Sequence, residues 1–425
     1  MNAVATSTKE AALAARVTES VRRNGALGLD TSEALATLEV LPYPTTRLER
    51  WKYTRVANLL SLEVEDAPQT ALPTPILPAL DAHRLTFVGG CFADGDITDE
   101  GPDGCFIGPV SEAMKRYPER VSALMEKGFQ SQEWYAALQA AAPQDGGCVL
   151  VPKGTAPKKP ILIRHFMPDG AVAAQPQHLL DVAENSTAEV ILWYDCTPAA
   201  AGLLNGALTA HVGDHGALSL EIVQNEPGAS SHIGHHHFTQ GHHSNLTVRT
   251  ATACAHWLRN DLHIVQDGSD ASSTFHGCYL PNGRQFVDHH TRIDHAQPDG
   301  HSEELYKGLA ADRAIGVFNG KIMVHKDAQR IEAYQSNANL LLGEQAAMYA
   351  KPELEIYADD VRCSHGCTTG QFDAEALFYL RSRGMTETAA HSLLVQAFLA
   401  EVLDGFRPEI RACVHDVYAQ RLGWT

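Results

Sequence analysis

Residues 359–371, DDVRCSHGCTTGQ, place Cys363, His365 and Cys367 at every second position. In an extended strand these three side chains lie on one face, because successive side chains alternate. Thiolate and imidazole groups are good ligands for transition metals. A tetrahedral metal ion needs ligands that surround one point, however, and a straight strand cannot close that shell alone. The residues by themselves leave two interpretations open: an incomplete metal site, or small buried thiols beside a hydrogen-bonded histidine.

A second cluster, SHIGHHHFTQGHHS at 231–244, places His235 and His237 on one face of a predicted strand. This pair suits a mononuclear-metal oxygenase, a class that also needs a nearby Glu and a distant third His. The residues that follow, 238–241, contain no Glu. A mononuclear-metal oxygenase built on the His-rich strands therefore stays the alternative hypothesis, and the role of segment 232–243 stays open.

Motifs for hydrolytic chemistry are incomplete. GVFNGKI at 316–322 is one residue short of phosphate-loop spacing and has Ile322 where a hydroxyl residue is required. Asp359 and Asp360 are adjacent, so on a strand they face opposite sides, which disfavours paired acid–base chemistry. A β-helix lyase or hydrolase would need a cleft of clustered acids. We therefore predict that the chain is not an enzyme.

Composition restricts the partners and the compartment. The 425-residue chain has a net charge of −18, which disfavours nucleic acid and anionic membranes, because both attract Lys and Arg. The N-terminal residues lack the apolar core of a signal peptide, and no stretch approaches about eighteen apolar residues. The nine cysteines are an odd number and do not suggest a disulfide framework. We predict a cytoplasmic protein with reduced thiols.

Apolar periodicity divides the chain into regions of different secondary structure. Residues 1–142 show the apolar spacing of helices joined by Pro-rich links. From 147 to 371 the pattern alternates: in GALSLEIVQNE, Leu218, Leu220 and Ile222 share one face. So long an all-strand region fits a large sandwich, a propeller or a solenoid of stacked short strands. The absence of a strict repeat length argues most against the propeller.

Residues 372–425 return to the helical period. The segment TETAAHSLLVQAFLAEVLDG carries a broad apolar stripe. We predict that this stripe consists of Leu393, Leu394, Ala397, Phe398, Glu401 and Val402. The helices are interpreted either as a docking module for another protein or as a cap on the strand core, and these residues do not decide between the two.

One run of sequence, residues 318–385, closely resembles the SufB/SufD family of iron–sulfur cluster assembly proteins. The resemblance rests on AYQSNANLLL, PELEIYADDV, CSHG and LFYLRSRG, and extends more loosely through TFHGCYLPNGRQFVDHHT and HSEELYKGL to ERWKYT at 49–54. The chain is similar to SufD-like members: it lacks the N-terminal Cys-rich motif of SufB-like chains and has Ala346 where they carry a Cys. It departs from SufD-like members at Cys367, which replaces their usual Ala and is assigned no role.

The resemblance implies a mainly β fold: a right-handed parallel β-helix over 147–371, flanked by an N-terminal, mainly helical region at 1–142 and a C-terminal helical module at 372–425. It implies edge-to-edge pairing of this β-helix with that of SufB, and docking of the ATPase SufC on the C-terminal helices. Flavin has been associated with the assembled complex, but the sequence shows no flavin-binding feature.

The resemblance also gives the opening stretch a role. It implies a transient iron or iron–sulfur cluster at the SufB interface, with no cofactor bound stably by the chain alone. His365 is the predicted ligand or proton acceptor there, and Cys363 is a second, weaker candidate. Whether the chain forms a homodimer in isolation is left open.

Overall fold

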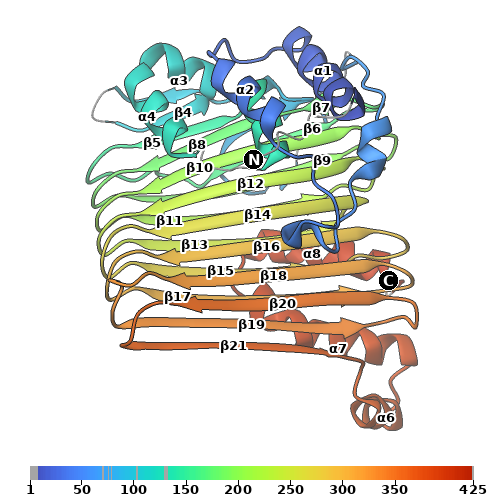
Figure 1. Ribbon diagram of the computed structural model, residues 1–425. Coiled ribbons are helices and arrows are strands. Elements are labelled where there is room, and N and C mark those ends of the chain that lie inside the picture. The colour runs from blue at the N-terminus through green and yellow to red at the C-terminus, as the bar shows by residue number, and fades with distance from the viewer. Residues whose placement is uncertain are drawn as a thin grey trace.

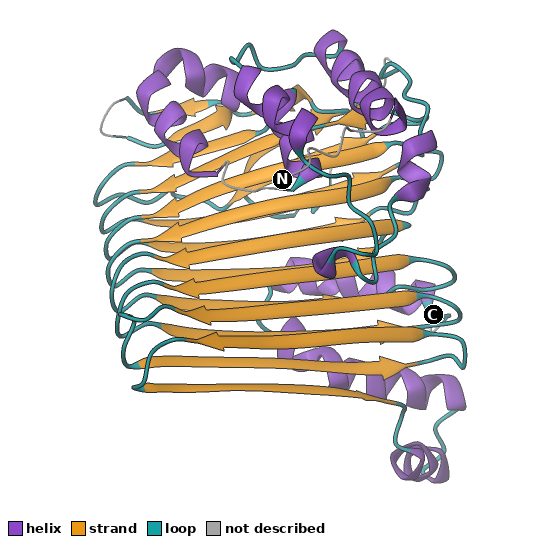
Figure 2. Cartoon of the chain, viewed as in Figure 1, coloured by secondary structure: helices purple, strands orange, loops and turns teal. Residues whose placement is uncertain are grey.

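In the computed structural model of the protein, residues 8–68, 71–74, 76–77, 79–101, 104–128 and 133–423 are described. Two sheets, built mostly of parallel strands, face each other and form a β-solenoid of about eight coils (Figure 1). Helices lie at both ends of the chain (Figure 2). Strands make up 42% of the residues and helices 24%. The predicted parallel β-helix with flanking helical regions is confirmed.

The chain alternates between the sheets, so strands that pair are separated by one full coil. In the described residues the first sheet has ten strands, in spatial order β2 (Cys91–Gly95), β1 (His83–Val88), β6 (Ile161–Met167), β9 (Thr187–Cys196), β11 (Ala217–Asn225), β13 (Asn245–Cys254), β15 (Ser272–Tyr279), β17 (His301–Ala310), β19 (Ile331–Leu341) and β21 (Val361–Gly370). The second has eleven: β20 (Ala347–Ile356), β18 (Ile315–Val324), β16 (Phe286–His295), β14 (Trp257–Gln266), β12 (Ser231–Gln240), β10 (Leu203–Val212), β8 (Gln177–Val182), β5 (Gly147–Val151), β4 (Phe106–Pro109) and β3 (Thr98–Asp99), with β7 (Ala173–Ala174) beside β10.

In-register pairing stacks equivalent residues into columns inside the solenoid. Leu218 of β11 pairs with Leu246 of β13, and both are buried. Two residues farther along the same strands, Leu220 of β11 pairs with Val248 of β13 and belongs to the next column. Alternation therefore sends one set of side chains into the core on every coil, as the sequence pattern predicts.

The turns between the coils explain why the His-rich segment has a histidine at position 243. A residue with positive φ other than Gly precedes several strands of the ten-stranded sheet: Asn185, His215, His243, Asp270 and Asp299. Asn, Asp and His tolerate this left-handed conformation better than most residues. His243 thus has a structural role at a turn.

The N-terminal region contains both helices and short strands. The helices are α1 (Thr8–Arg23), α2 (Ser32–Val40), η1 (Glu49–Trp51), η2 (Ala57–Ser61), α3 (Val110–Arg116), α4 (Pro118–Gly128) and α5 (Trp134–Ala141). The description of 1–142 as helices and links missed β1 to β4. These strands have two to six residues each, too few for alternation to be recognised. β1 pairs with β6 and thereby extends the solenoid.

The ERWKYT segment at 49–54 reaches the last coil. The ring of Tyr53 stacks on that of Tyr349 in β20, with centroids 4.5 Å apart. Glu49 accepts a hydrogen bond from Lys351 of the same strand, with an Oε1–Nζ distance of 2.6 Å. Residues 49–54 therefore contact a strand that is distant in the sequence. Glu49 and Lys351 are 302 residues apart.

Three helices follow the last strand: α6 (Ala374–Ser382), α7 (Glu387–Leu403) and α8 (Pro408–Arg421). α7 and α8 pack on the outer face of the ten-stranded sheet, against Trp193 and Leu305 among others. The predicted stripe of α7 is wrong in part, because Leu393 and Ala397 are exposed. The buried positions are Ala390, Val395, Leu399, Val402 and Leu403. α7 is apolar around most of its circumference, so periodicity alone could not identify the packed face.

None of the helices within the described ranges combines the length and the apolar character needed to cross a membrane.

Candidate functional site

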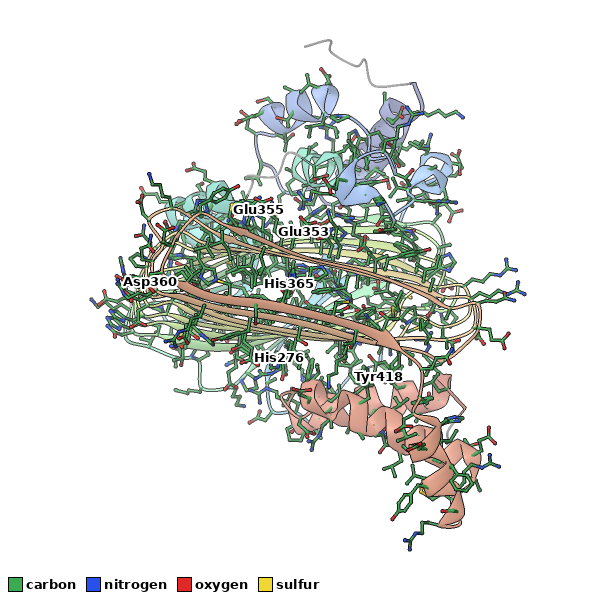
Figure 3. All side chains as sticks on the ribbon, turned by 60° about the horizontal axis from the view of Figure 1, so that its bottom comes forward. His276, Glu353, Glu355, Asp360, His365 and Tyr418 are labelled. Atoms are coloured by element: carbon green, nitrogen blue, oxygen red, sulfur yellow. The ribbon has the colours of Figure 1, made fainter. Side chains whose placement is uncertain are left out.

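Strands β20 and β21 lie together at one end of the solenoid. Each is the last strand of its sheet, and neither has a second neighbouring strand among the described residues. Both have ten residues. One row of backbone donors and acceptors on each strand is therefore available for pairing. We call this surface the open end (Figure 3).

The structure places Cys363, His365 and Cys367 on the inward face of β21. β21 pairs in parallel with β19, and these three residues stand opposite Ala333, Gln335 and Asn337. All three partners in β19 are buried, so their columns point into the solenoid. Figure 3 shows His365 on the side of β21 that faces β20. The three side chains thus share one face, as the spacing predicts.

The members of this row differ in exposure. His365 and Cys367 are exposed, whereas Cys363 is partly buried beside Val361 and Leu354 in a small apolar cluster. Partial burial raises the pKa of the Cys363 thiol. A raised pKa lowers the fraction of thiolate, which is the metal-binding form. His365 is consequently better placed as a ligand than Cys363.

The row does not make a complete metal site. No group of three or more His, Cys, Asp and Glu side chains with the geometry of a metal site occurs among the residues that the structure describes. On a single strand the three groups point along parallel directions and do not converge. Further ligands for a metal ion held at His365 would have to come from outside this row.

The outer His-rich strands do not supply the alternative site. His235 and His237 lie on the outward face of β12 and line an open groove of about 1670 Å³. His235 contacts Asn205, with 3.2 Å between Nε2 and Oδ1, and the ring of His237 lies 5.1 Å from that of His263. Burial lowers the pKa of both His235 and His237 to about 4, so both are neutral near pH 7. The described residues add no third ligand here, and the oxygenase hypothesis gains no support.

Sequence reasoning missed two polar residues in the interior, Glu304 and Gln335. Glu304 Oε2 accepts a hydrogen bond from Gln335 Nε2 over 2.6 Å, and both side chains are buried. Burial raises the pKa of Glu304 to about 7, with the hydrogen bond acting in the opposite direction. The signal was present in HSEELYKGL, where an acid occupies the inward phase of a strand.

Helix α6 carries large apolar side chains on its surface. Phe378 is 75% exposed and Tyr379 is 56% exposed, and Leu393 of α7 is 43% exposed. Exposed aromatic residues grouped on a short helix are typical of protein–protein contacts. These three residues are distinct from the apolar residues of α7 and α8 that pack on the sheet.

Comparison with known proteins covers nearly the whole chain. The family model described as "SUF system FeS cluster assembly, SufBD core domain" matches residues 165–398, and "SufBD protein N-terminal region" matches residues 27–163. The chain is 29% identical to the iron–sulfur cluster assembly protein SufD of Escherichia coli, over 86% of each chain. It is 28% identical to a SufBD family protein of Synechocystis, over 96% of this chain and 93% of the relative. It is 26% identical to the chloroplastic protein ABCI7 of Arabidopsis thaliana, over 87% and 80%.

Proposed function

The chain belongs to the SufBD family of iron–sulfur cluster assembly proteins, and we propose that it acts there as a SufD-like subunit that pairs with SufB and docks the ATPase SufC. It supports iron acquisition and cluster formation and is not itself a catalyst. We place this complex in the cytoplasm.

The open end is the observation that carries the proposal. β20 and β21 offer two adjacent edges of ten residues each, and an uncovered edge is a template for strands of another molecule. A second β-helix stacked on these edges would continue both sheets. In the family this partner is SufB, and a homodimer would use the same edges when SufB is absent.

His365 supplies one ligand at this interface. A neutral imidazole is a good ligand for iron, and a thiolate from SufB provides what the straight row of β21 cannot. Iron or a nascent cluster is the cargo of the site, held only while the two subunits face each other. Cys363, whose thiol is partly buried, is the weaker second candidate.

The C-terminal helices provide the second docking surface. Their buried side covers the ten-stranded sheet, so α7 and α8 belong to the core of the fold. The side that remains, with Phe378, Tyr379 and Leu393 exposed, is where we place SufC. A separate ATPase agrees with the missing phosphate loop in GVFNGKI.

Complementation of cells that depend on this pathway tests the proposal. His365→Ala should fail to support growth at matched expression and with intact complex assembly, because the cargo loses its ligand from this chain. His237→Ala and Cys367→Ala should complement fully, and Cys363→Ala should give an intermediate result. Full growth with His365→Ala would contradict the interface site, and purification without SufB at equal expression would contradict the pairing.

A further inference from the structure

A short polar column lies directly behind His365 inside the solenoid. Glu304 of β17, Gln335 of β19 and His365 of β21 occupy successive positions of one column. The first two are 1% and 3% exposed. Farther from the open end the same column continues through Phe275 and Val248, which are buried and apolar. Polarity in this column is therefore confined to the positions next to His365.

The amide of Gln335 is held in a fixed place. Its Nε2 donates to Glu304 Oε2 over 2.6 Å. On the opposite sheet, Gly320 of β18 leaves room for it: a Cβ added at Gly320 would lie 2.1 Å from Gln335 Nε2. Any larger residue at this position would displace the amide. The sequence thus combines a hydrogen-bond acceptor on one side of Gln335 with a glycine on the other.

The carbonyl end of this amide is left without a partner. Gln335 Oε1 is buried and has no hydrogen-bond donor among the described residues. Because its NH₂ group is the donor to Glu304, Gln335 turns its Oε1 away from that carboxyl group and keeps it available as an acceptor. A buried acceptor without a donor destabilises the folded state. His365 is the next residue of the column, about 4.8 Å farther along.

We propose that Gln335 is a positioning residue for His365, whose imidazole N–H donates to Gln335 Oε1 while the other ring nitrogen holds iron or a cluster. The inference rests on the proposed function of His365. Histidines that bind metals generally donate their second N–H to a fixed acceptor, which sets the tautomer, orients the ring and makes the ligating nitrogen more basic. Glu304 acts one step farther away, by holding the Gln335 amide.

A double-mutant cycle on the assembled complex with SufB and SufC tests this role. The variants are Gln335→Met, which keeps the side-chain length without an acceptor, His365→Ala, and the two combined. Ser336→Ala is the matched control, because Ser336 is the adjacent residue of β19 and is exposed on the opposite face. The readouts are the affinity for ferrous iron, by anaerobic equilibrium dialysis, and the melting temperature.

Gln335→Met should weaken iron binding about 10–100-fold when His365 is present. In the His365→Ala background the same change should have no further effect, and Ser336→Ala should bind iron as the unmodified complex does. The exchange variant Glu304→Gln/Gln335→Glu keeps one donor, one acceptor and the total charge, so it should retain the affinity. It also provides a test if Gln335→Met does not fold.

The outcomes separate this inference from the proposed function. If His365→Ala loses iron but Gln335→Met binds normally, the positioning role is wrong while the site stands. An equal loss from Gln335→Met in both backgrounds means that Gln335 has only a structural role, and a loss of iron by the folded exchange variant also contradicts the proposal. If His365→Ala binds iron normally, both the site and the positioning role are wrong.

Discussion

The two ends of the solenoid are built differently although the coils between them are alike. At the N-terminal end, helices and short strands cover the first coils, and Leu85 and Phe87 are fully buried. At the C-terminal end, β20 and β21 have no covering strand in the described chain, and the inward-facing His365 is exposed. A solenoid needs a cap wherever its core would otherwise meet water. The uncapped end, with polar residues in its column, is the surface on which the proposed pairing rests.

Substitution of a core residue at the covered end should have the largest effect on stability. Phe87→Ala removes a fully buried ring and should lower the free energy of unfolding by about 3–5 kcal/mol. His365→Ala, the matched change at the open end, should lower it by at most about 1.5 kcal/mol, because the exposed side chain contributes no more than one hydrogen bond to Gln335. Denaturant unfolding of both variants checks this. Similar losses would mean that the open end is part of the stability core.

The buried Glu304, near the open end, should make the stability of the fold depend on pH. The pKa of Glu304 is about 7 in the folded chain and lies near 4.3 in an unfolded one, so the folded state binds the proton more tightly. Stability from this group is present below about pH 4.3 and is lost as the pH rises through 7, to a total of about 4 kcal/mol. Glu304→Gln should remove this component.

Melting temperatures of the unmodified chain and Glu304→Gln, measured between pH 5 and pH 8.5, test that expectation. The variant should gain stability relative to the unmodified chain toward high pH. Parallel curves would mean that Glu304 is not protonated by burial. His178 at the covered end serves as a contrast, because burial lowers its pKa to about 3 and its contribution is lost as the pH falls.

Helix α6, which follows β21, offers a third test, for which we expect the smallest change in the free energy of unfolding. Phe378→Ala combined with Tyr379→Ala should weaken capture of SufC about 10–100-fold, since exposed aromatic residues often dominate binding. The melting temperature should not change, because neither side chain packs on the sheet. Leu399→Ala is the control, since it should destabilise the fold through lost packing. Unchanged SufC affinity in the double variant would place the ATPase elsewhere.

Features that depend on the short-range pattern of residues could be predicted from the sequence. Alternation put Cys363, His365 and Cys367 on one face, and family motifs indicated the β-helix. Neither Gln335 nor Glu304 could be assigned to the site, because their positions behind His365 follow from the register of strands about 30 residues apart. Strands β1 to β4 were missed because they are short, and the packed face of α7 because its circumference is mostly apolar.

The attachment of Tyr53 and Glu49 to β20 has a consequence for the order of folding. Coils contact mainly their neighbours, so the solenoid can form progressively as the chain leaves the ribosome. Segment 49–54 cannot complete its contacts until Tyr349 and Lys351 have been synthesised. These contacts have a very large sequence separation and a correspondingly slow closure. Their formation therefore marks a chain in which strand β20, one of the two edges of the open end, is in place.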